Sequence, residues 1–463
     1  MKARRNTFWW LISGLVVVAL LLTACGPQPA EEPAEEPAEE PVEEPAEEPV
    51  EVIWYVRTEE AEQPWEQDVV IPDFESKHPN IKINLTVVTW DDFDTKMQTM
   101  IAAGTPPDVW SHWGPSGFAD YVIRGLAADL TPYIERDNFD MSDFIPEVLD
   151  IYTIDGKVYG LPMLTTGSFI FYNKDLFDAA GVEYPPTNWD DTSWTWDAFV
   201  EKCGQLTNDT GDPETTVFGC NLGFWPNDAY AWVWGQDLYP DSAYETGFAE
   251  EAYLDSEAAI NGFQARQDLV WDLNYMPDPA QADAFGGGDI FMGGKVAMHL
   301  TGGWGWWNYD GLEEEFNWGV AALPYGAPER RCVVFTDPWM LSAKTEHPDE
   351  AWEFLKYLAS PEVQRGWMEL VGAPPARKSL AEDWYEHFPT MTPEEVEELH
   401  LGALKHGRES PNHLLVRFDQ LNQVVNSALD PIFNNEAEAA DVLPEANEEL
   451  EEALKSIKEE YGE

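Results

Sequence analysis

From residue 52 onward, the chain alternates runs rich in β-branched and aromatic residues with amphipathic helical stretches. The order is strand, helix, strand, helix, strand over residues 50–60, 64–80, 81–88, 90–104 and 105–114. Strands that alternate with helices predict an α/β fold, in which a mostly parallel sheet carries helices on both faces. Ligands of such sheets bind beyond the carboxyl ends of the strands.

The alternation continues, and the chain is long enough for more than one core. Residues 160–182 are typical of a strand followed by a helix, residues 192–207 of a capped helix, and residues 295–300 of a strand before a tryptophan-rich loop. The last third is largely helical in pattern. Because residues 52–463 exceed what one hydrophobic core usually serves, we expect two lobes.

The charge of the chain limits the classes of partner that it can bind. The formal net charge at pH 7 is -61, from 87 acidic and 26 basic residues. Nucleic acid and anionic lipid surfaces are poor partners for such a chain, so we expect no nucleic-acid binding.

The first 51 residues have the pattern of an export signal and a tether. Basic residues precede an apolar run, which predicts a signal peptide over residues 1–24, and the run ends in Leu-Thr-Ala before Cys25, which resembles a bacterial lipobox. An ordinary signal peptide or a short anchor helix is the alternative. The Pro/Glu-rich linker that follows to residue 51 carries eleven glutamates and cannot pack a core. We therefore expect a folded part held outside the cytoplasm on a lipidated Cys25.

Three further cysteines allow at most one internal bridge. Cys203 and Cys220 are the closest pair in sequence and form a possible disulfide, while the alternative is that they and Cys332 are buried free thiols. No two cysteines have C-x-x-C spacing and the eight histidines are scattered. The sequence therefore predicts no metal site and no cofactor.

Five stretches, in the same order along the chain, resemble one known family. They are AAGTPPDVW, GKVYGLPMLTTGSFIFYNKDLFDAAGV, FMGGKVAMHLTGGWGWW, FNWGVAALPYG and HPDEAWEFLKYLASPEVQRGW, at residues 102–110, 156–182, 291–307, 316–326 and 347–367. Together with the lipobox, they are similar to the extracellular solute-binding proteins of ABC importers, family 1, which are maltose-binding-protein-like sugar binders.

The resemblance implies a two-lobed periplasmic-binding-protein fold of type II, with discontinuous lobes that close by hinge bending. Lobe one would be residues 52–165 and 336–385, and lobe two residues 166–335 and 386–463. It also implies a monomer that delivers a mono- or oligosaccharide to the transmembrane subunits of an ABC permease, from a lipid anchor in the cell envelope.

Tryptophans in loops suit a carbohydrate ligand. A pyranose stacks its C–H faces on an aromatic plane and needs hydrogen-bond partners for its hydroxyl groups, and several of the 22 tryptophans lie in predicted loops. Plain packing is the alternative for each of them. Loop position and the resemblance together give these ligand-binding candidates: Arg57, Glu59, Trp90, His112, Thr166, Trp225, Trp304, Trp306, Asp337, Trp339 and Arg377.

Other classes of protein are less well supported. A glycoside hydrolase would also need aromatic plates and a pair of acids, but so many acids are present that some pair always exists. No G-x-S-x-G motif occurs, and the glycine-rich residues 285–295 fit no phosphate loop, so we expect no catalysis. A receptor for a polyamine, a peptide or another polyol, and a surface adhesin, are the remaining alternatives.

Overall fold

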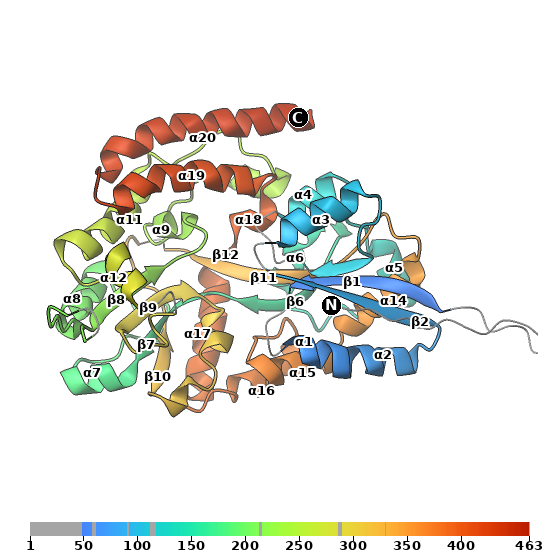
Figure 1. Cartoon of the computed structure of the whole chain (residues 1–463), viewed down its shortest axis with the longest axis horizontal. Helices are drawn as coiled ribbons and strands as arrows, with labels where there is room; N and C mark the ends of the chain where they lie inside the picture. The colour runs from blue at the N-terminus through green and yellow to red at the C-terminus, as the bar shows by residue number, and fades with distance from the viewer. Residues whose placement is uncertain are drawn as a thin grey trace, which may run out of the picture. The chain divides into compact units, whose positions relative to one another are not determined.

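The computed structural model describes residues 49–57, 62–89, 92–111, 117–212, 215–285, 289–328 and 330–462. The described residues all belong to one compact unit, which spans residues 48–463 (Figure 1). None of the helices in these residues combines the length and the apolar character that a membrane span requires.

The strands and helices follow one another along most of this unit. The strands are β1 Val50–Arg57, β2 Ile81–Val88, β3 Val109–Ser111, β4 Thr153–Ile154, β5 Lys157–Val158, β6 Leu161–Thr166, β7 Ser168–Asn173, β8 Phe218–Gly223, β9 Val296–Gly302, β10 Trp318–Ala321, β11 Cys332–Leu341 and β12 Gly407–Glu409. The helices are α1 Glu62–Trp65, α2 Ile71–Lys77, α3 Phe93–Ala102, α4 Phe118–Ile123, α5 Thr131–Asp137, α6 Pro146–Ile151, α7 Lys174–Ala180, α8 Trp196–Leu206, α9 Asp228–Trp232, α10 Asp241–Thr246, α11 Glu257–Gln267, α12 Pro279–Ala284, α13 Gly305–Asn308, α14 Pro348–Leu358, α15 Pro361–Val371, α16 Ala381–Tyr385, α17 Pro393–His406, α18 Pro411–Leu414, α19 Phe418–Phe433 and α20 Ala439–Tyr461.

The first sheet has the strand order β12-β11-β3-β1-β2, and β6 also pairs with β11. Strand β1 is parallel to β2 and β3, whereas β11 is antiparallel to β3 and β6. Successive side chains of β1 point to opposite faces. Trp54 therefore joins a core with Phe354 of α14, while Tyr55 joins a second core with Phe93 of α3. The prediction of an α/β fold with helices on both faces of the sheet is confirmed, whereas the expectation of a mostly parallel sheet is too simple, because β11 is antiparallel to both β3 and β6.

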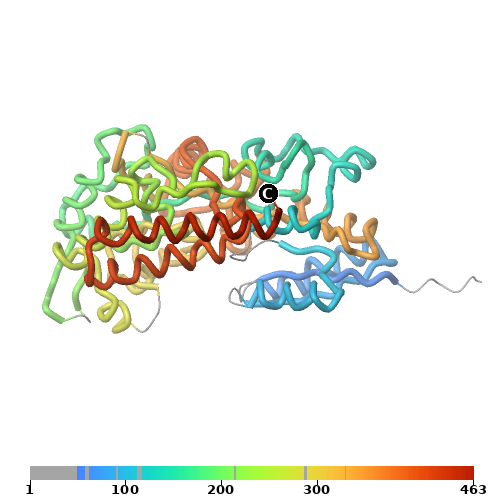
Figure 2. Tube along the Cα trace, turned by 90° about the horizontal axis from the view of Figure 1, so that it is seen from above, coloured from blue at the N-terminus to red at the C-terminus, as the bar shows by residue number. Residues whose placement is uncertain are grey.

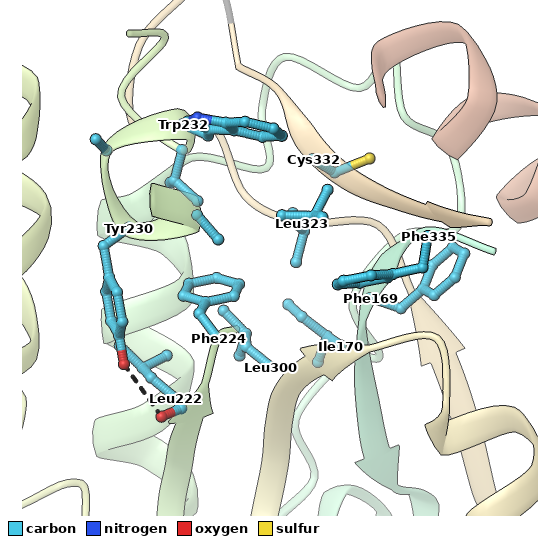
Figure 3. Packing of buried hydrophobic residues seen from close by; sticks show 14 of the residues in the cluster. Phe169, Ile170, Leu222, Phe224, Tyr230, Trp232, Leu300, Leu323, Cys332 and Phe335 are labelled. Atoms are coloured by element: carbon cyan, nitrogen blue, oxygen red, sulfur yellow. Dashed lines mark hydrogen bonds between the residues drawn. The ribbon is translucent and has the colours of Figure 1, made fainter. Parts of the chain in front are cut away.

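The second sheet has the order β10-β7-β9-β8, with β7 antiparallel to β9 and β10 and with β8 parallel to β9. Its core is the largest hydrophobic cluster among the described residues. Figure 3 shows Phe169, Ile170 and Leu300 in this core, where Tyr230 donates from its hydroxyl to the carbonyl oxygen of Leu222 at 3.3 Å.

Gly167 is the point at which the chain leaves the first sheet for the second. The sequence predicts one strand before the helix at residues 174–180, but the structure has two strands, β6 and β7, in different sheets. A Cβ on Gly167 would lie 2.5 Å from the Cβ of Ala403, so a larger residue would not fit here.

Strand β11 joins the two cores. Cys332, Val333 and Phe335 pack in the core of the second sheet, while Trp339 and Leu341 pack in that of the first. Its register against β6 shifts between Asp337 and Pro338, where proline donates no backbone hydrogen bond. The lobe boundaries predicted from the resemblance remain a prediction.

The chain ends in two long helices that cover the second sheet's helical layer. Helix α20 packs beside α19, and both contact α11, as the C-terminal part of the trace in Figure 2 illustrates. Leu443, Leu450, Leu454 and Ile457 form the buried stripe of α20 at helical spacing.

Candidate functional site

Two parallel strands of the first sheet end at one pocket, which we call the indole pocket after the side chains of Trp54, Trp65, Trp339 and Trp367 that line it. Arg57 ends β1 and Ser111 ends β3, and both line this pocket. The rings of Trp54 and Trp339 lie 5.9 Å apart between centroids. The carboxyl ends of parallel strands are where ligands of α/β sheets bind.

Several buried polar atoms around the indole pocket have no hydrogen-bond partner in the described part of the chain. They are Oε2 of Glu66, Oγ of Ser111, Oε1 of Gln364, Nε1 of Trp54 and Nε1 of Trp339. A buried polar group without a partner is destabilising by about 1–3 kcal/mol, so native proteins seldom leave one unpaired without water or ligand. The pocket therefore presents acceptors and donors that a polar ligand can satisfy.

A second group of aromatic side chains lies where β8 and β9 end. Trp225 follows β8 and stacks on Phe335 at 6.2 Å and 24°, while Trp304 follows β9 and lies 5.1 Å from the same ring. We call Trp225, Trp304 and Phe335 the aromatic cluster. Both tryptophans are only half-buried. Thr166 is the β6 partner of Phe335 and is buried against Gly303.

Asp337 lies on β11 between the aromatic cluster and the indole pocket. Nε2 of His413 is 3.7 Å from Oδ1 of Asp337, and Nδ1 of His413 contacts Oε1 of Glu409. Burial raises the pKa of Asp337 to about 7, with His413 and Arg57 acting in the opposite direction. Burial also raises the pKa of Glu409 and lowers that of His413 to about 4, so their neutral forms are favoured near pH 7.

The structure places two of the predicted ligand residues elsewhere. Trp306 is 0% exposed and packs edge-on against Phe169 and Trp384 in the core of the second sheet. Arg377 is buried, donates to the carbonyl oxygen of Ala359 at 2.6 and 2.8 Å, and pairs with Asp143 at 3.1 Å. A ring enclosed in the core presents no face to a sugar and the guanidinium is already bonded, so we leave both out of the candidate site, and their role as ligand residues stays a prediction.

The possible bridge between Cys203 and Cys220 is not formed in the structure. These two cysteines and Cys332 are free and buried. Burial raises the pKa of the Cys203 thiol well above its usual value, and a hydrogen bond with Cys220 acts in the same direction. The alternative of three buried thiols is the one found.

The structure describes some of the remaining predicted residues and not others. Glu59, Trp90, His112 and the lipidation residue Cys25 lie outside the described residues. Arg57, Thr166, Trp225, Trp304, Asp337 and Trp339 are within them, and β11 links the two groups they form.

Sequence reasoning missed several residues of the indole pocket. Ser111, Gln364 and Trp367 come together only through sheet pairing and helix packing, so no local pattern marks them. The sequence did contain a signal for Glu62 and Glu66, because two acids four residues apart on a helix share one face. Both are buried in the structure.

Two sheets joined by crossing strands, with aromatic rings and unpaired polar atoms at their strand ends, define a receptor for a small solute. The chain belongs to the family of bacterial extracellular solute-binding proteins, whose model matches residues 58–365. The predicted family and the class, a binding protein and not an enzyme, are thereby confirmed. The folded part of an extracellular protein lies outside the cytoplasm.

Individual relatives can be aligned with this chain over most of its length. A binding protein of Brucella abortus (strain 2308) is 26% identical over 391 residues, which is 82% of this chain and 88% of the relative. The multiple sugar-binding protein of Streptococcus mutans is 24% identical over 335 residues, 68% of this chain and 72% of the relative.

A solved structure confirms the two-lobed fold. The ABC substrate-binding protein of Listeria monocytogenes, in complex with cycloalternan, matches with a TM-score of 0.74 and 24% identity. The match covers 88% of this chain and 100% of the other.

Proposed function

We propose that this protein is the lipid-anchored receptor of an ABC importer, which binds a mono- or oligosaccharide between its lobes and delivers it to the permease. The observation that carries the proposal is the pairing of aromatic rings with polar groups at the strand ends of both sheets. Relatives named for sugars, such as the multiple sugar-binding protein of Streptococcus mutans, support the choice of carbohydrate.

The proposed contacts divide between hydrophobic stacking and hydrogen bonding. Trp304 and Trp225 offer half-exposed rings on which the C–H face of a pyranose stacks. Arg57 donates to hydroxyl groups and Asp337 accepts from them, with Trp339 and Thr166 beside them on β11 and β6. Glu59, Trp90 and His112 complete the proposed set from outside the described residues. The protein acts as a monomer.

Closure of the lobes is the proposed conformational change. The lobes comprise residues 52–165 with 336–385, and 166–335 with 386–463, so the chain passes between them near Gly167 and along β11. A ligand that contacts both lobes binds the closed form better and shifts the population toward it. Closure also excludes water, which strengthens each hydrogen bond to the solute.

Saturable binding of an intact sugar tests the receptor function. Titration of residues 52–463 with a panel of mono- and oligosaccharides is expected to change the intrinsic tryptophan fluorescence, since Trp225 and Trp304 are half-buried and gain a ligand. Chromatography of each solution afterwards is expected to recover the sugar unchanged. A hydrolysed sugar would indicate an enzyme instead, and binding of only a polyamine or peptide would reassign the solute.

The anchor is tested at Cys25. The full-length chain expressed in a bacterial host is expected to incorporate labelled palmitate and to fractionate with membranes, whereas Cys25→Ser is expected to do neither. Cys332→Ser is the matched control, because that thiol is buried in the folded part. Equal labelling of wild type and Cys25→Ser would contradict the anchor.

A further inference from the structure

Two buried glutamates face the indole pocket from one side of a helix. Glu62 on α1 and Glu66 on the π-helical turn Glu66–Val70 are 8% and 7% exposed, and they lie one helical turn apart. Oε1 of Glu62 accepts from Nε1 of Trp367 at 2.6 Å. Oε2 of Glu66 has no partner in the described part of the chain, and Glu66 lines the pocket, so this carboxyl group in its ionised form retains an acceptor for a ligand.

Further unpaired acceptors line the same pocket. Nε2 of Gln364 donates to the carbonyl oxygen of Pro162 at 3.0 Å, which orients the amide and leaves Oε1 unpaired. Oγ of Ser111, which is 0% exposed, is unpaired as well. An ammonium group has three N–H donors and no acceptor. Glu66, Gln364 and Ser111 together offer three acceptors, which matches that requirement.

The four indoles of the pocket also favour a cation. Tryptophan is the aromatic side chain that attracts cations most strongly, and the attraction grows when water is excluded. The pocket has a volume of about 30 Å³, and a cavity needs about 10–15 Å³ to hold a water molecule, so an ammonium group, which is of similar size, fits within it.

The pocket has donors as well, and these indicate what accompanies the cation. Nε1 of Trp54 and Nε1 of Trp339 are both buried and unpaired in the described residues. They suit the oxygen atoms of hydroxyl groups next to an amine. Arg57 is the only cationic residue among the described residues that line the pocket, and its charge also lowers the pKa of Asp337. Acceptors for an amine next to donors for hydroxyl groups are the pattern that an amino sugar requires.

We propose that the indole pocket receives the ammonium group of an amino sugar, with Glu66 as its main partner, so that the transported carbohydrate is a cationic one. The inference rests on the proposed function and specifies its substrate class.

The protonation of Glu66 gives the inference a direct readout. Burial, and then the charge of Glu62, raise the pKa of the Glu66 carboxyl to about 9, so the group is protonated at pH 7 in the empty pocket. An ammonium group placed beside it favours the ionised form. Binding of an amino sugar at pH 7 therefore releases about one proton from Glu66.

Calorimetric titration of residues 52–463 tests the pocket with matched probes. Glucosamine is compared with glucose and N-acetylglucosamine, chitosan oligosaccharides with cello-oligosaccharides, and methylammonium chloride with sodium chloride. The amine member of a pair is expected to bind at least about tenfold more tightly than its neutral partner. Titrations in phosphate and in HEPES are expected to show release of about one proton per amine bound.

The variant Glu66→Gln keeps the shape of the side chain and is expected to abolish both the preference for the amine and the proton release. Asp68→Asn is the matched control, because Asp68 is an exposed acid on the same turn, and it is expected to keep both. Equal affinity within every pair, or a preference that persists in Glu66→Gln, would overturn the inference.

The outcomes separate this inference from the receptor function. A neutral sugar that binds as well as its amine partner leaves the receptor intact and removes the amine pocket. Methylammonium that binds to wild type but not to Glu66→Gln, with no sugar bound by either, supports the pocket and removes the carbohydrate. Absence of binding by all probes overturns both.

The stability of Glu66→Gln shows that the variant is folded and tests the burial of Glu66 independently. The folded-state pKa lies above the ordinary value, so the contribution of Glu66 to stability is present below pH 4.5 and is lost as the pH rises through about 9. In urea unfolding without ligand, Glu66→Gln is therefore expected to gain on wild type as the pH rises from 5 to 9. A constant difference would contradict the burial of an unpaired carboxyl group.

Discussion

Replacement of Trp306 by alanine is expected to reduce the free energy of unfolding by about 3–5 kcal/mol, the range for truncating a buried aromatic side chain. The side chain of Trp306 is 0% exposed and its ring lies 4.7 Å from that of Phe388 and 5.3 Å from that of Trp384. Truncation leaves a cavity that this rigid cluster fills only in part. Urea or guanidinium unfolding of residues 52–463, followed by tryptophan fluorescence and circular dichroism, measures the loss.

Trp304→Ala is the matched control, at the residue that precedes α13, two positions before Trp306. Trp304 is half-buried and packs on Phe335 over Gly302, so its truncation is expected to have a smaller effect on stability. Its sugar affinity is expected to fall by about tenfold or more, which corresponds to 1.4 kcal/mol of lost stacking. The opposite pattern, in which Trp306→Ala is stable and binds poorly while Trp304→Ala binds normally, would exchange the two roles.

Trp304 and Trp306 illustrate how much of the candidate site the sequence can predict. The GGWGWW segment places three tryptophans after a strand, and resemblance to the family marks the loop as part of the cleft. Nothing local distinguishes Trp304 from Trp306, because both follow a glycine. Their different environments depend on α13, which turns Trp306 toward Phe169 and Trp384, and on Phe335, which comes from a distant strand.

The elements themselves were more predictable than the site. Strands β1 and β2 and helices α3 and α8 follow from local periodicity, and the capped helix predicted within residues 192–207 is α8, whose N-cap is Thr195. The resemblance to the family placed a lobe boundary between residues 165 and 166, but the local pattern indicated one strand where the structure has two, β6 and β7, because the break at Gly167 depends on the close approach of Ala403 from α17. Ser111 and Gln364 were missed for the same reason, since each belongs to the indole pocket only after the sheet and α15 assemble.

Replacement of Arg377 by alanine is expected to have the second large effect, which is on stability and not on binding. Nε and Nη2 donate to the carbonyl oxygen of Ala359, Nη1 pairs with Asp143, and the guanidinium lies 4.1 Å from the centre of the Phe144 ring. Arg377→Ala leaves this carbonyl and carboxylate without their donor in a mostly buried site. The expected loss is about 3 kcal/mol in the free energy of unfolding, measured by denaturant titration.

Arg365→Ala provides the comparison, because Arg365 also pairs with an aspartate, Asp383, but at the surface, where its side chain is 42% exposed. Water screens such a pair, so its loss is expected to change stability by less than about 1 kcal/mol. Both variants are expected to bind sugar as wild type does once folded. If Arg377→Ala instead kept its stability and lost sugar affinity, the guanidinium would contact the solute, as expected from its inclusion among the ligand-binding candidates. The two measurements therefore decide whether Arg377 supports the fold that positions the site or belongs to the site itself.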